Sequence, residues 1–489
     1  MGKIDLLFIK PGDQKKIYGP LSSGLSAIEP PLWAALLAAY AREQGLSVDL
    51  VDIEAEGLDP KDATERIREL GPGLIVFTVT GTNLSASTWN MCGAGLYHAE
   101  LKRELPQTKT MFWGLHPSAL PGRTLIEEKT DFVCVGEGFD AIVNLAVAIR
   151  DGIPDPAFAG IWQLKDDKVV PNGRSQVIVK LDELPTPAWD LLPMSNYRAH
   201  NWHCFQDIEH RSPYGVIYTS LGCPFNCSFC ALKTLFEGKP GIRYRSPEKV
   251  IEDIDVLVKK HGIKNIKVFD ECFVLKESHV SEICELIIER GYDLNLWAYS
   301  RIDTVNERML KQMKKAGFNW LAYGIEAGAK DVRSGVSKGR YGQEDIKGAV
   351  CMTKEVGIHV CANFMFGLPD DDQQTMRETL ELAKELNCEY TNFYVTMAYP
   401  GSQLYLDALE QGIPLPKTWR GYSQFSAECL PLPTKYLSAA EVLRFRDEAF
   451  VEFHSSEKYL QMMKQTFGET IAEHIKVMLG KSLEREILK

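Results

Sequence analysis

The sequence predicts an α/β protein in which an N-terminal doubly wound, Rossmann-like parallel sheet is followed by a partial (β/α)6 TIM-like barrel and a small helical C-terminal region. Short apolar runs alternate with amphipathic helical runs in two stretches of the chain, and a proline-rich segment separates them. The length of 489 residues also exceeds one compact domain of about 100 to 200 residues. We expect domains over residues 1–150 and 211–425 with separate cores, a linker over 151–210, and helices over 426–489.

The first stretch of alternation predicts the doubly wound domain. We expect strands over residues 4–9, 47–53, 73–78, 110–113 and 131–135, with helices between them. Strands that are separated by helices pair in parallel, and such sheets bind ligands at the carboxyl ends of their strands. The loops at those ends hold the candidate ligand-binding residues Pro11, Thr80, Thr82, Gly114, His116, Pro117, Ser118, Gly136, Glu137 and Gly138.

The second stretch of alternation predicts the barrel. Residues 151–210 contain six prolines and read as a linker with a small hairpin near 161–179. Strands are expected over residues 215–219, 266–270, 294–298, 320–325, 359–366 and 390–396, with helices between them. Six β/α units of this kind fit a partial barrel. The tail from Ser438 is predicted to be helical, because Ser438 and Glu441 have the spacing of a capping box.

The composition excludes several classes of protein. Lys and Arg number 55 against 66 Asp and Glu, and the formal net charge of −11 disfavours a broad electrostatic attraction to nucleic acid or anionic lipid. The first residues do not have the pattern of a signal peptide, and the longest apolar run, 31–40, is shorter than the about 18 residues of a membrane span. We expect a cytoplasmic protein with no nucleic-acid partner and no integral membrane segment.

The strongest signal for a site is a cluster of three cysteines, Cys223, Cys227 and Cys230, directly after the first barrel strand. In the reducing cytosol, clustered cysteines are read as metal ligands, and thiolates suit iron–sulfur clusters and zinc. A structural zinc site closes with four ligands, and no second CxxC pair follows, although His203 and His210 each offer one more ligand. Three cysteines without an obvious fourth favour a 4Fe–4S cluster with one open iron.

A CxxxCxxC motif after a first barrel strand resembles the motif of the radical S-adenosylmethionine (radical SAM) enzymes. In that family the three cysteines bind a 4Fe–4S cluster and SAM chelates the fourth iron. With a doubly wound domain in front, about residues 1–450 resemble the cobalamin-dependent class. The resemblance implies a 4Fe–4S cluster, SAM and cobalamin as cofactors, and an external electron donor such as ferredoxin or flavodoxin. It also implies methyl transfer to an unactivated carbon as the reaction.

The resemblance implies roles for residues along the barrel strands. Cys223, Cys227 and Cys230 correspond to the ligands of the cluster. The positions that correspond to SAM contacts are Phe229 and Gly367 near the adenine, Ser300 and Arg301 at the carboxylate or ribose, and Glu326 at the ammonium or ribose. The positions expected to be catalytic are Asp270 and Glu271 after the second strand and Tyr399 after the sixth.

The resemblance also implies that the front domain binds cobalamin through the loops named above. Many cobalamin domains carry an Asp-x-His-x-x-Gly motif whose histidine binds cobalt, but residues 12–19 contain no histidine. We therefore expect the lower ligand of cobalt to be water, absent or from elsewhere. The segment 113–118 resembles the Gly-Gly-x-His-Pro-Thr turn of the class with Trp113 in place of the first glycine, and 136–138 resembles its Gly-Glu-Gly turn.

Two other functions stay open at this point. The first is a radical SAM enzyme that binds cobalamin and catalyses cyclisation, dehydration or oxidation instead of methylation. The second is a non-catalytic metal-binding protein with zinc at the cysteines. The sequence does not identify the substrate, which is a small molecule or a peptide side chain.

Overall fold

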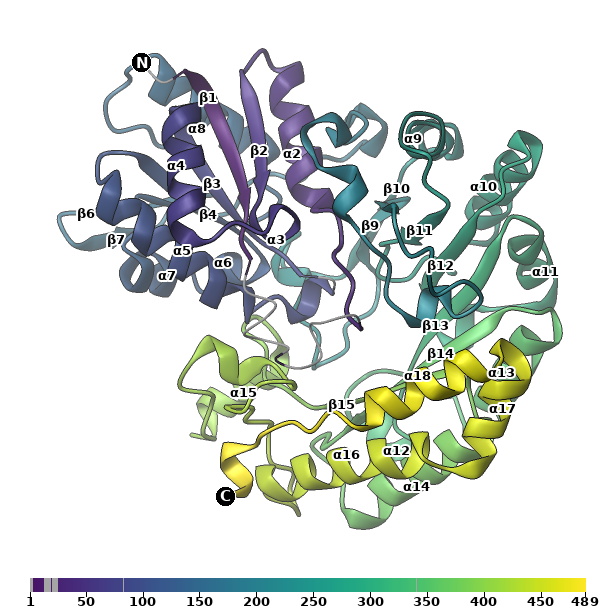
Figure 1. The fold of residues 1–489 in the computed structure, drawn as a ribbon. Helices are drawn as coiled ribbons and strands as arrows, with labels where there is room; N and C mark the ends of the chain where they lie inside the picture. Colours follow the sequence, from purple (N-terminus) through teal and green to yellow (C-terminus); the bar gives the residue numbers. More distant parts are fainter. Residues whose placement is uncertain (1–2, 13–18, 20–24, 82, 340) are drawn as a thin grey trace.

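The structure is a computed structural model that describes residues 3–489 apart from 13–18, 20–24, 82 and 340. Its strands form two large sheets and one two-stranded hairpin. Figure 1 shows the front sheet, in purple and blue, beside the barrel, in teal and green, with yellow helices along the outside of the barrel. The predicted α/β fold class is confirmed.

The front sheet has seven strands in the order β2-β1-β3-β4-β5-β6-β7. The strands from β1 to β5 pair in parallel, as predicted. The strands are β1 (Ile4–Lys10), β2 (Val48–Asp52), β3 (Pro72–Val79), β4 (Lys109–Gly114), β5 (Phe132–Cys134), β6 (Ile161–Lys165) and β7 (Lys168–Val170). The helices around them are α2 (Leu32–Glu43), α3 (Ile53–Glu56), α4 (Pro60–Leu70), α5 (Asn90–Glu104), α6 (Leu115–Ala119), α7 (Pro121–Glu128) and α8 (Phe139–Arg150).

The hairpin expected in the linker is instead the edge of the front sheet. Strand β6 pairs antiparallel with β5, and β7 pairs antiparallel with β6. The backbone of Val135 continues this pairing, because its N–H donates to Gly160 and its carbonyl accepts from Ser175. Without the hairpin, β5 would present a row of unpaired backbone groups, which a sheet edge has to cover.

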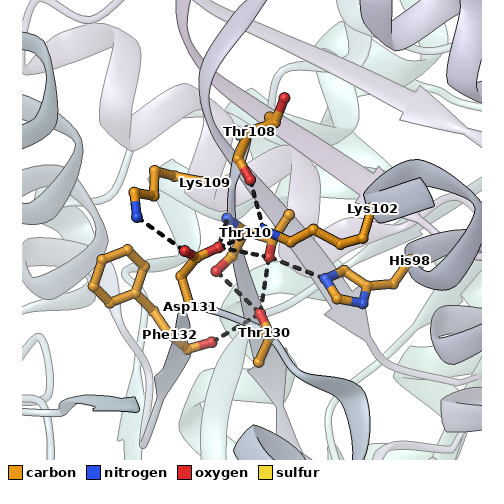
Figure 2. Close-up of polar contacts among 8 residues, drawn as sticks. All are labelled: His98, Lys102, Thr108, Lys109, Thr110, Thr130, Asp131 and Phe132. Carbon is orange, nitrogen blue, oxygen red and sulfur yellow. Dashed lines mark hydrogen bonds and ion pairs between the residues drawn. The ribbon is translucent and has the colours of Figure 1, made fainter. Parts of the chain in front are cut away.

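A polar cluster joins β4 and β5 where both strands begin (Figure 2). The Asp131 carboxylate accepts hydrogen bonds from Lys102 Nζ at 2.7 Å, from Lys109 Nζ at 3.0 Å and from the Thr110 N–H at 3.0 Å. His98 Nε2 lies 3.0 Å from Thr110 Oγ1. Ligands bind at the carboxyl ends of parallel strands, and this cluster lies at the amino ends of β4 and β5. We therefore infer that it stabilises the sheet and is not part of a ligand site.

The barrel sheet has six strands in the chain order β8-β11-β12-β13-β14-β15. All neighbours pair in parallel, as the (β/α)6 prediction requires. The strands are β8 (Tyr214–Ile217), β11 (Asn265–Val268), β12 (Asn295–Ser300), β13 (Phe318–Glu326), β14 (His359–Phe366) and β15 (Tyr390–Val395). The helices are α9 (Pro247–His261), α10 (Glu277–Arg290), α11 (Glu307–Lys315), α12 (Lys330–Gly335), α13 (Gln343–Glu355), α14 (Gln373–Leu386) and α15 (Gln403–Glu410). A hairpin of β9 (Ser220–Cys223) and β10 (Gly241–Tyr244) follows β8.

The C-terminal region is helical, as predicted, and consists of α16 (Ala439–His454), α17 (Glu457–Phe467) and α18 (Glu469–Leu479). Ser438 and Glu441 form the predicted capping box at the start of α16. Helix α16 packs on β15 and α14, so this region covers the last units of the barrel. None of the helices in the described part of the chain has the length and apolarity to cross a bilayer.

The expectation of separate cores is wrong, because one apolar cluster runs through both sheets. Trp33 of α2 contacts Trp113 in the front sheet and Tyr218 in the barrel, and its indole N–H donates to the Tyr218 hydroxyl at 2.8 Å. A buried ion pair also crosses the boundary: Lys267 Nζ, on a β11 side chain that is 1% exposed, lies 3.2 Å from both carboxylate oxygens of Glu29. The two domains are therefore packed as one unit.

Candidate functional site

The three cysteines lie on one loop at the mouth of the barrel. Cys223 ends β9, and the loop continues to Cys230, whose N–H donates to the Cys227 carbonyl at 3.0 Å. Gly222 has a positive φ of 95°, and a Cβ there would lie 2.3 Å from the Gly241 carbonyl oxygen of β10. Only glycine allows β10 to approach so closely, so this hairpin fixes where the cysteine loop begins.

The three cysteines supply the sulfur donors of an iron–sulfur cluster. All three cysteines are free and partly buried. Burial raises the pKa of Cys223 and Cys230 to about 12 and raises that of Cys227, while Lys338 acts in the opposite direction on Cys227. Among the described residues, no three His, Cys, Asp or Glu side chains converge on a single ion. A cubane cluster does not need such convergence, because each cysteine binds a different iron.

A buried ion pair lies beside Cys227. Lys338 Nζ is 2.7 Å from Glu326 Oε1, and both side chains interact electrostatically with the Cys227 thiol. Glu326 has a φ of 65°, a conformation that is costly for a residue other than glycine. At Gly324, a Cβ would lie 2.5 Å from Lys338 Nζ. The bulge at the end of β13 thus brings one carboxylate and one ammonium together at the cysteine loop.

Arg301 does not have the free guanidinium that the sequence led us to expect. Its Nε and Nη2 each donate at 2.9 Å to the Asp303 carboxylate, and Nη2 also donates to the Lys338 carbonyl at 2.6 Å. Its guanidinium also stacks on Phe225, 3.7 Å from the ring centre. Arg301 is therefore engaged in orienting the cysteine loop and the Lys338 loop. Ser300 donates to the Arg301 carbonyl at 3.1 Å, so its hydroxyl is directed at its own backbone.

The two acidic residues after β11 differ in their surroundings, and the carboxylate of Asp270 is engaged in hydrogen bonds within the fold. Its carboxylate is 1% exposed and accepts hydrogen bonds from the Thr219 N–H at 2.7 Å, the Thr219 hydroxyl at 2.6 Å and the Ser220 hydroxyl at 2.6 Å. Asp270 therefore joins β11 to the end of β8. No described residue hydrogen-bonds to the Glu271 carboxylate, and burial raises its pKa to about 7. Glu271 also interacts electrostatically with Cys223 and Cys230.

Three other predicted barrel residues pack against neighbouring segments. Phe229 contacts two small apolar clusters, one around α15 and one after β13. Gly367 has a φ of 81°, and a Cβ there would lie 2.4 Å from Val442 of α16, so its glycine is required for packing of the tail. The Tyr399 hydroxyl donates to the Tyr422 carbonyl at 3.4 Å, and its ring contacts Trp89 of the front domain.

The loop after β3 and the short helix α6 after β4 carry several of the predicted cobalamin residues. His116 is fully buried, its Nδ1 lies 3.3 Å from Thr88 Oγ1, and its Nε2 has no hydrogen-bond partner among the described residues. Burial and the charge of Arg123 lower the pKa of His116 to about 3. The ring of Trp419 packs edge-on against His116, with 4.4 Å between the ring centres. A neutral imidazole with one unpartnered nitrogen fits a polar group bound beside α6.

The remaining predicted front-domain residues are buried or hold the loops together. Pro11 and Pro117 are buried. The Thr80 carbonyl accepts from Asn90 Nδ2 at 3.0 Å, and the Ser118 hydroxyl accepts from the Gly136 N–H at 3.0 Å. A Cβ on Gly114 would lie 2.3 Å from the Val79 carbonyl oxygen. Thr82 and most of residues 12–19 lie outside the described residues.

The Gly-Glu-Gly turn packs against neighbouring segments on the sides where side chains at its two glycines would project. A Cβ on Gly136 would lie 2.6 Å from Ser175, and one on Gly138 would lie 2.9 Å from Trp113. The Glu137 carboxylate is fully buried, pairs with Arg243 of β10 and accepts from the Ile178 N–H at 3.0 Å. Because β10 pairs with the β9 strand that ends at Cys223, Glu137 connects the front domain to the cysteine hairpin.

Comparisons with known proteins agree with this two-part site. Family models for the B12 binding domain and the radical SAM superfamily match residues 25–146 and 217–383. An uncharacterized methyltransferase of Pyrococcus horikoshii is 30% identical over 434 residues, which are 88% of this chain and 89% of that protein. The chain belongs to the cobalamin-dependent radical SAM enzymes. The cofactors of this family, a 4Fe–4S cluster, SAM and cobalamin, are those predicted from the sequence.

This radical SAM enzyme is also similar to two further proteins. The anaerobic magnesium-protoporphyrin IX monomethyl ester cyclase of Rubrivivax gelatinosus is 27% identical over 390 residues, which are 77% of this chain and 66% of the cyclase. The solved structure of OxsB, a cobalamin-dependent SAM radical enzyme with aqua-cobalamin and SAM bound, superposes with a TM-score of 0.72 at 15% identity. The match covers 97% of this chain and 71% of OxsB, and it shows the shared fold.

Sequence reasoning missed Lys338 and Arg243, which the radical SAM fold brings to the cysteine loop. Lys338 follows α12 in a loop with no motif, and Arg243 lies on a strand that was not predicted. The sequence signal for Lys338 was the Gly324-Ile325-Glu326 segment. Gly324 precedes Glu326, the predicted SAM residue, and its missing side chain leaves room for the Lys338 ammonium.

Proposed function

We propose that the protein is a cobalamin-dependent radical SAM methyltransferase that transfers a methyl group to an unactivated carbon of its substrate. The observation that carries this proposal is the position of the cysteine loop, which contacts the loops at the carboxyl ends of the front strands. Ser85, in the loop after β3, accepts a hydrogen bond at 3.0 Å from Ala231, the residue after the last cysteine. The name of the Pyrococcus relative supports methyl transfer over other radical reactions.

Three groups of residues are proposed to hold the cofactors. Cys223, Cys227 and Cys230 bind the cluster and leave one iron open. Lys338 and Glu326 bind the amino-acid end of SAM, because a buried ammonium and carboxylate match a carboxylate and an α-ammonium. The short helix α6 with His116 is proposed to hold cobalamin at the front sheet. When bound, these cofactors supply reductive cleavage of SAM and a transferable methyl group.

The chain's own residues orient the reactants and exclude water. Arg301 orients the Lys338 loop through the Lys338 carbonyl, and the Glu137–Arg243 pair connects the front domain to the cysteine hairpin. Glu271 carries a partly buried carboxyl group that interacts with the cysteines and has no hydrogen bond from a described residue, so we propose that it binds a polar group of the substrate. An external donor such as ferredoxin or flavodoxin is proposed to supply the electrons.

The test is anaerobic incubation of the reconstituted protein with methyl-deuterated SAM, a reductant and an extract of small molecules. Methylation predicts a product that gains one trideuteromethyl group in place of hydrogen, together with 5′-deoxyadenosine, methionine and S-adenosylhomocysteine. The Cys223→Ala, Cys227→Ala, Cys230→Ala triple variant is the matched control and is expected to form none of them. Absence of a deuterated product from an extract that supports 5′-deoxyadenosine formation contradicts methyl transfer.

The second candidate is a radical reaction without methylation, which the similarity to the Rubrivivax cyclase favours. In that case the same incubation gives 5′-deoxyadenosine and methionine with a substrate that changes mass without taking up deuterium. S-Adenosylhomocysteine is the product that separates the two candidates, because only methyl donation forms it.

A further inference from the structure

The last two strands of the barrel sheet, β14 and β15, have one closed face and one partly exposed face. The phenylalanines on the closed face, Phe364, Phe366 and Phe393, are at most 1% exposed, and two of them contact rings of helix α16. The residues that alternate with them are partly exposed, and they are Asn363, Met365, Asn392 and Tyr394. Because successive side chains of a strand point to opposite faces, these four lie on the inner face of the barrel.

The strand register places two of these residues beside the proposed SAM site. Gly324 of β13 is the register partner of Asn363, and Asn363 is the register partner of Asn392. A Cβ on Gly324 would lie 2.5 Å from Lys338 Nζ, which belongs to the ion pair proposed to bind the amino-acid end of SAM. Adjacent strands are about 4.8 Å apart, so Asn392 lies two strands, or about 10 Å, from Gly324. Asn392 is therefore close enough to contact a substrate that binds next to SAM.

A chain of hydrogen bonds fixes which atom of Asn392 is left for a ligand. The Tyr323 carbonyl can only accept, so Asn363 donates to it through Nδ2, at 3.1 Å. Asn363 Oδ1 then faces Asn392 and accepts from Asn392 Nδ2 at 2.9 Å. Asn392 Nδ2 also lies 3.6 Å from Cys361 Sγ, which takes its second donor position. The open atom of Asn392 is therefore Oδ1, an acceptor to which no described residue hydrogen-bonds.

The charges of the barrel favour one kind of ligand group at this acceptor. The two lysines that are buried in the described part of the barrel, Lys267 and Lys338, are paired with the carboxylates of Glu29 and Glu326. An anionic group at Asn392 would therefore gain no uncompensated ammonium from them and would meet another acceptor oxygen. A hydroxyl or amine group would instead donate a hydrogen bond to that oxygen.

We propose that Asn392 binds the substrate, and that the substrate carries a hydroxyl or amine group at this point and not a carboxylate or phosphate. Asn363 is a positioning residue, because its hydrogen bond to Asn392 turns the Asn392 acceptor toward the ligand. The inference rests on the proposed function, in which SAM binds at Lys338 and Glu326 and reacts with a substrate beside it.

The test compares full-length wild type, Asn392→Leu, Asn392→Asp and Thr391→Val after anaerobic reconstitution. Each protein is incubated with methyl-deuterated SAM, a reductant and a dilution series of a small-molecule extract, and the extract-dependent formation of 5′-deoxyadenosine is measured. Asn392→Leu removes the acceptor, so it is expected to need about tenfold more extract for the half-maximal rate, with the maximal rate and the SAM affinity unchanged.

Thr391→Val is the matched control on the same strand. The Thr391 side chain points to the opposite face, is 1% exposed, and its hydroxyl has no hydrogen-bond partner among the described residues. We expect Thr391→Val to need the same amount of extract as wild type. Iron, sulfide and SAM affinity report whether each variant is folded, and Asn392→Ala replaces Asn392→Leu if the larger side chain prevents folding.

Asn392→Asp tests the class of the substrate group. A carboxylate keeps an acceptor for a hydroxyl or amine but repels an anion. We therefore expect Asn392→Asp to reach its half-maximal rate with less extract than Asn392→Leu does. A requirement for more extract than Asn392→Leu would indicate an anionic group at this point and would overturn the proposed class.

The outcomes for the inference and for the proposed function are separate. A wild-type extract requirement in Asn392→Leu, with a full cluster and trideuteromethylated product still formed, would overturn the inference and leave methyl transfer intact. Formation of 5′-deoxyadenosine by wild type without any deuterated product would overturn methyl transfer. In that case the comparison at position 392 would still decide whether Asn392 contacts the substrate.

Discussion

Replacing Lys338 with methionine tests the proposed SAM site most specifically. Methionine keeps much of the apolar stem of the lysine but removes its ammonium, which lies 2.7 Å from Glu326 in side chains that are 11% and 8% exposed. Because the pair is buried, solvent screens it little, and a ligand carboxylate bound there would gain a charge-assisted hydrogen bond. Loss of such a bond costs about 1.5 to 3 kcal/mol, or about ten- to a hundredfold in affinity.

Isothermal titration calorimetry with SAM on the cluster-loaded protein measures this change. Lys330→Met is the matched control, because Lys330 lies on the nearby helix α12, is exposed and loses the same charge. We expect Lys330→Met to bind SAM like wild type and Lys338→Met to bind it about ten- to a hundredfold more weakly. The iron and sulfide content should be equal in all three proteins. Unchanged SAM affinity in Lys338→Met with a full cluster would refute the reasoning.

Three further predictions concern the rest of the molecule. Glu137→Ala should lower the free energy of unfolding by about 3 to 5 kcal/mol, because it leaves Arg243 without its buried partner. A double-mutant cycle with Arg243→Ala, measured by urea unfolding, should show strong coupling between the two residues. Additive effects of the two substitutions would contradict a stabilising Glu137–Arg243 ion pair. Burial acts to raise the pKa of Asp131, but hydrogen bonds from Lys102 and its other donors outweigh burial and hold the pKa below its usual value. The ionised Asp131 carboxylate should therefore stabilise the fold above about pH 4, and this stabilisation should be lost as the pH falls through the lowered pKa. The urea unfolding midpoints of wild type and Asp131→Asn should then converge in acid. A difference between the two midpoints that stays constant with pH would contradict this prediction. His116→Ala should weaken cobalamin binding, measured as the cobalamin retained after gel filtration, without changing the iron content. Equal retention in wild type and His116→Ala would show that His116 does not contribute to cobalamin binding.

The fold was predictable from the sequence because the apolar periodicity of each strand is local. All six barrel strands and the five parallel front strands were expected at their observed places within a few residues. The hairpin of β6 and β7 was expected as an element but not as the edge of the front sheet, because its partner β5 is distant in the chain. The shared core was missed for the same reason, since Trp33 contacts Tyr218 across 185 positions.

The sequence predicted which site residues lie at the ends of strands, but not the contacts that their side chains make. The sequence placed Asp270 and Arg301 at the correct ends of β11 and β12. It did not show that the Asp270 carboxylate accepts a hydrogen bond from Thr219, or that the Arg301 guanidinium donates to Asp303. Lys338 has no motif, and its place depends on the missing side chain of Gly324 and on the positive φ of Glu326. Such contacts depend on tertiary packing and not on local pattern.

The central claim is that Cys223, Cys227 and Cys230 bind a 4Fe–4S cluster whose open iron takes SAM. The most direct measurement is electron paramagnetic resonance of the anaerobically reconstituted and reduced protein, with and without SAM. We expect wild type to give the signal of a reduced 4Fe–4S cluster that changes shape when SAM is added, and the triple alanine variant to give no cluster signal. A cluster signal in the triple variant, or a wild-type signal that SAM leaves unchanged, would contradict the account.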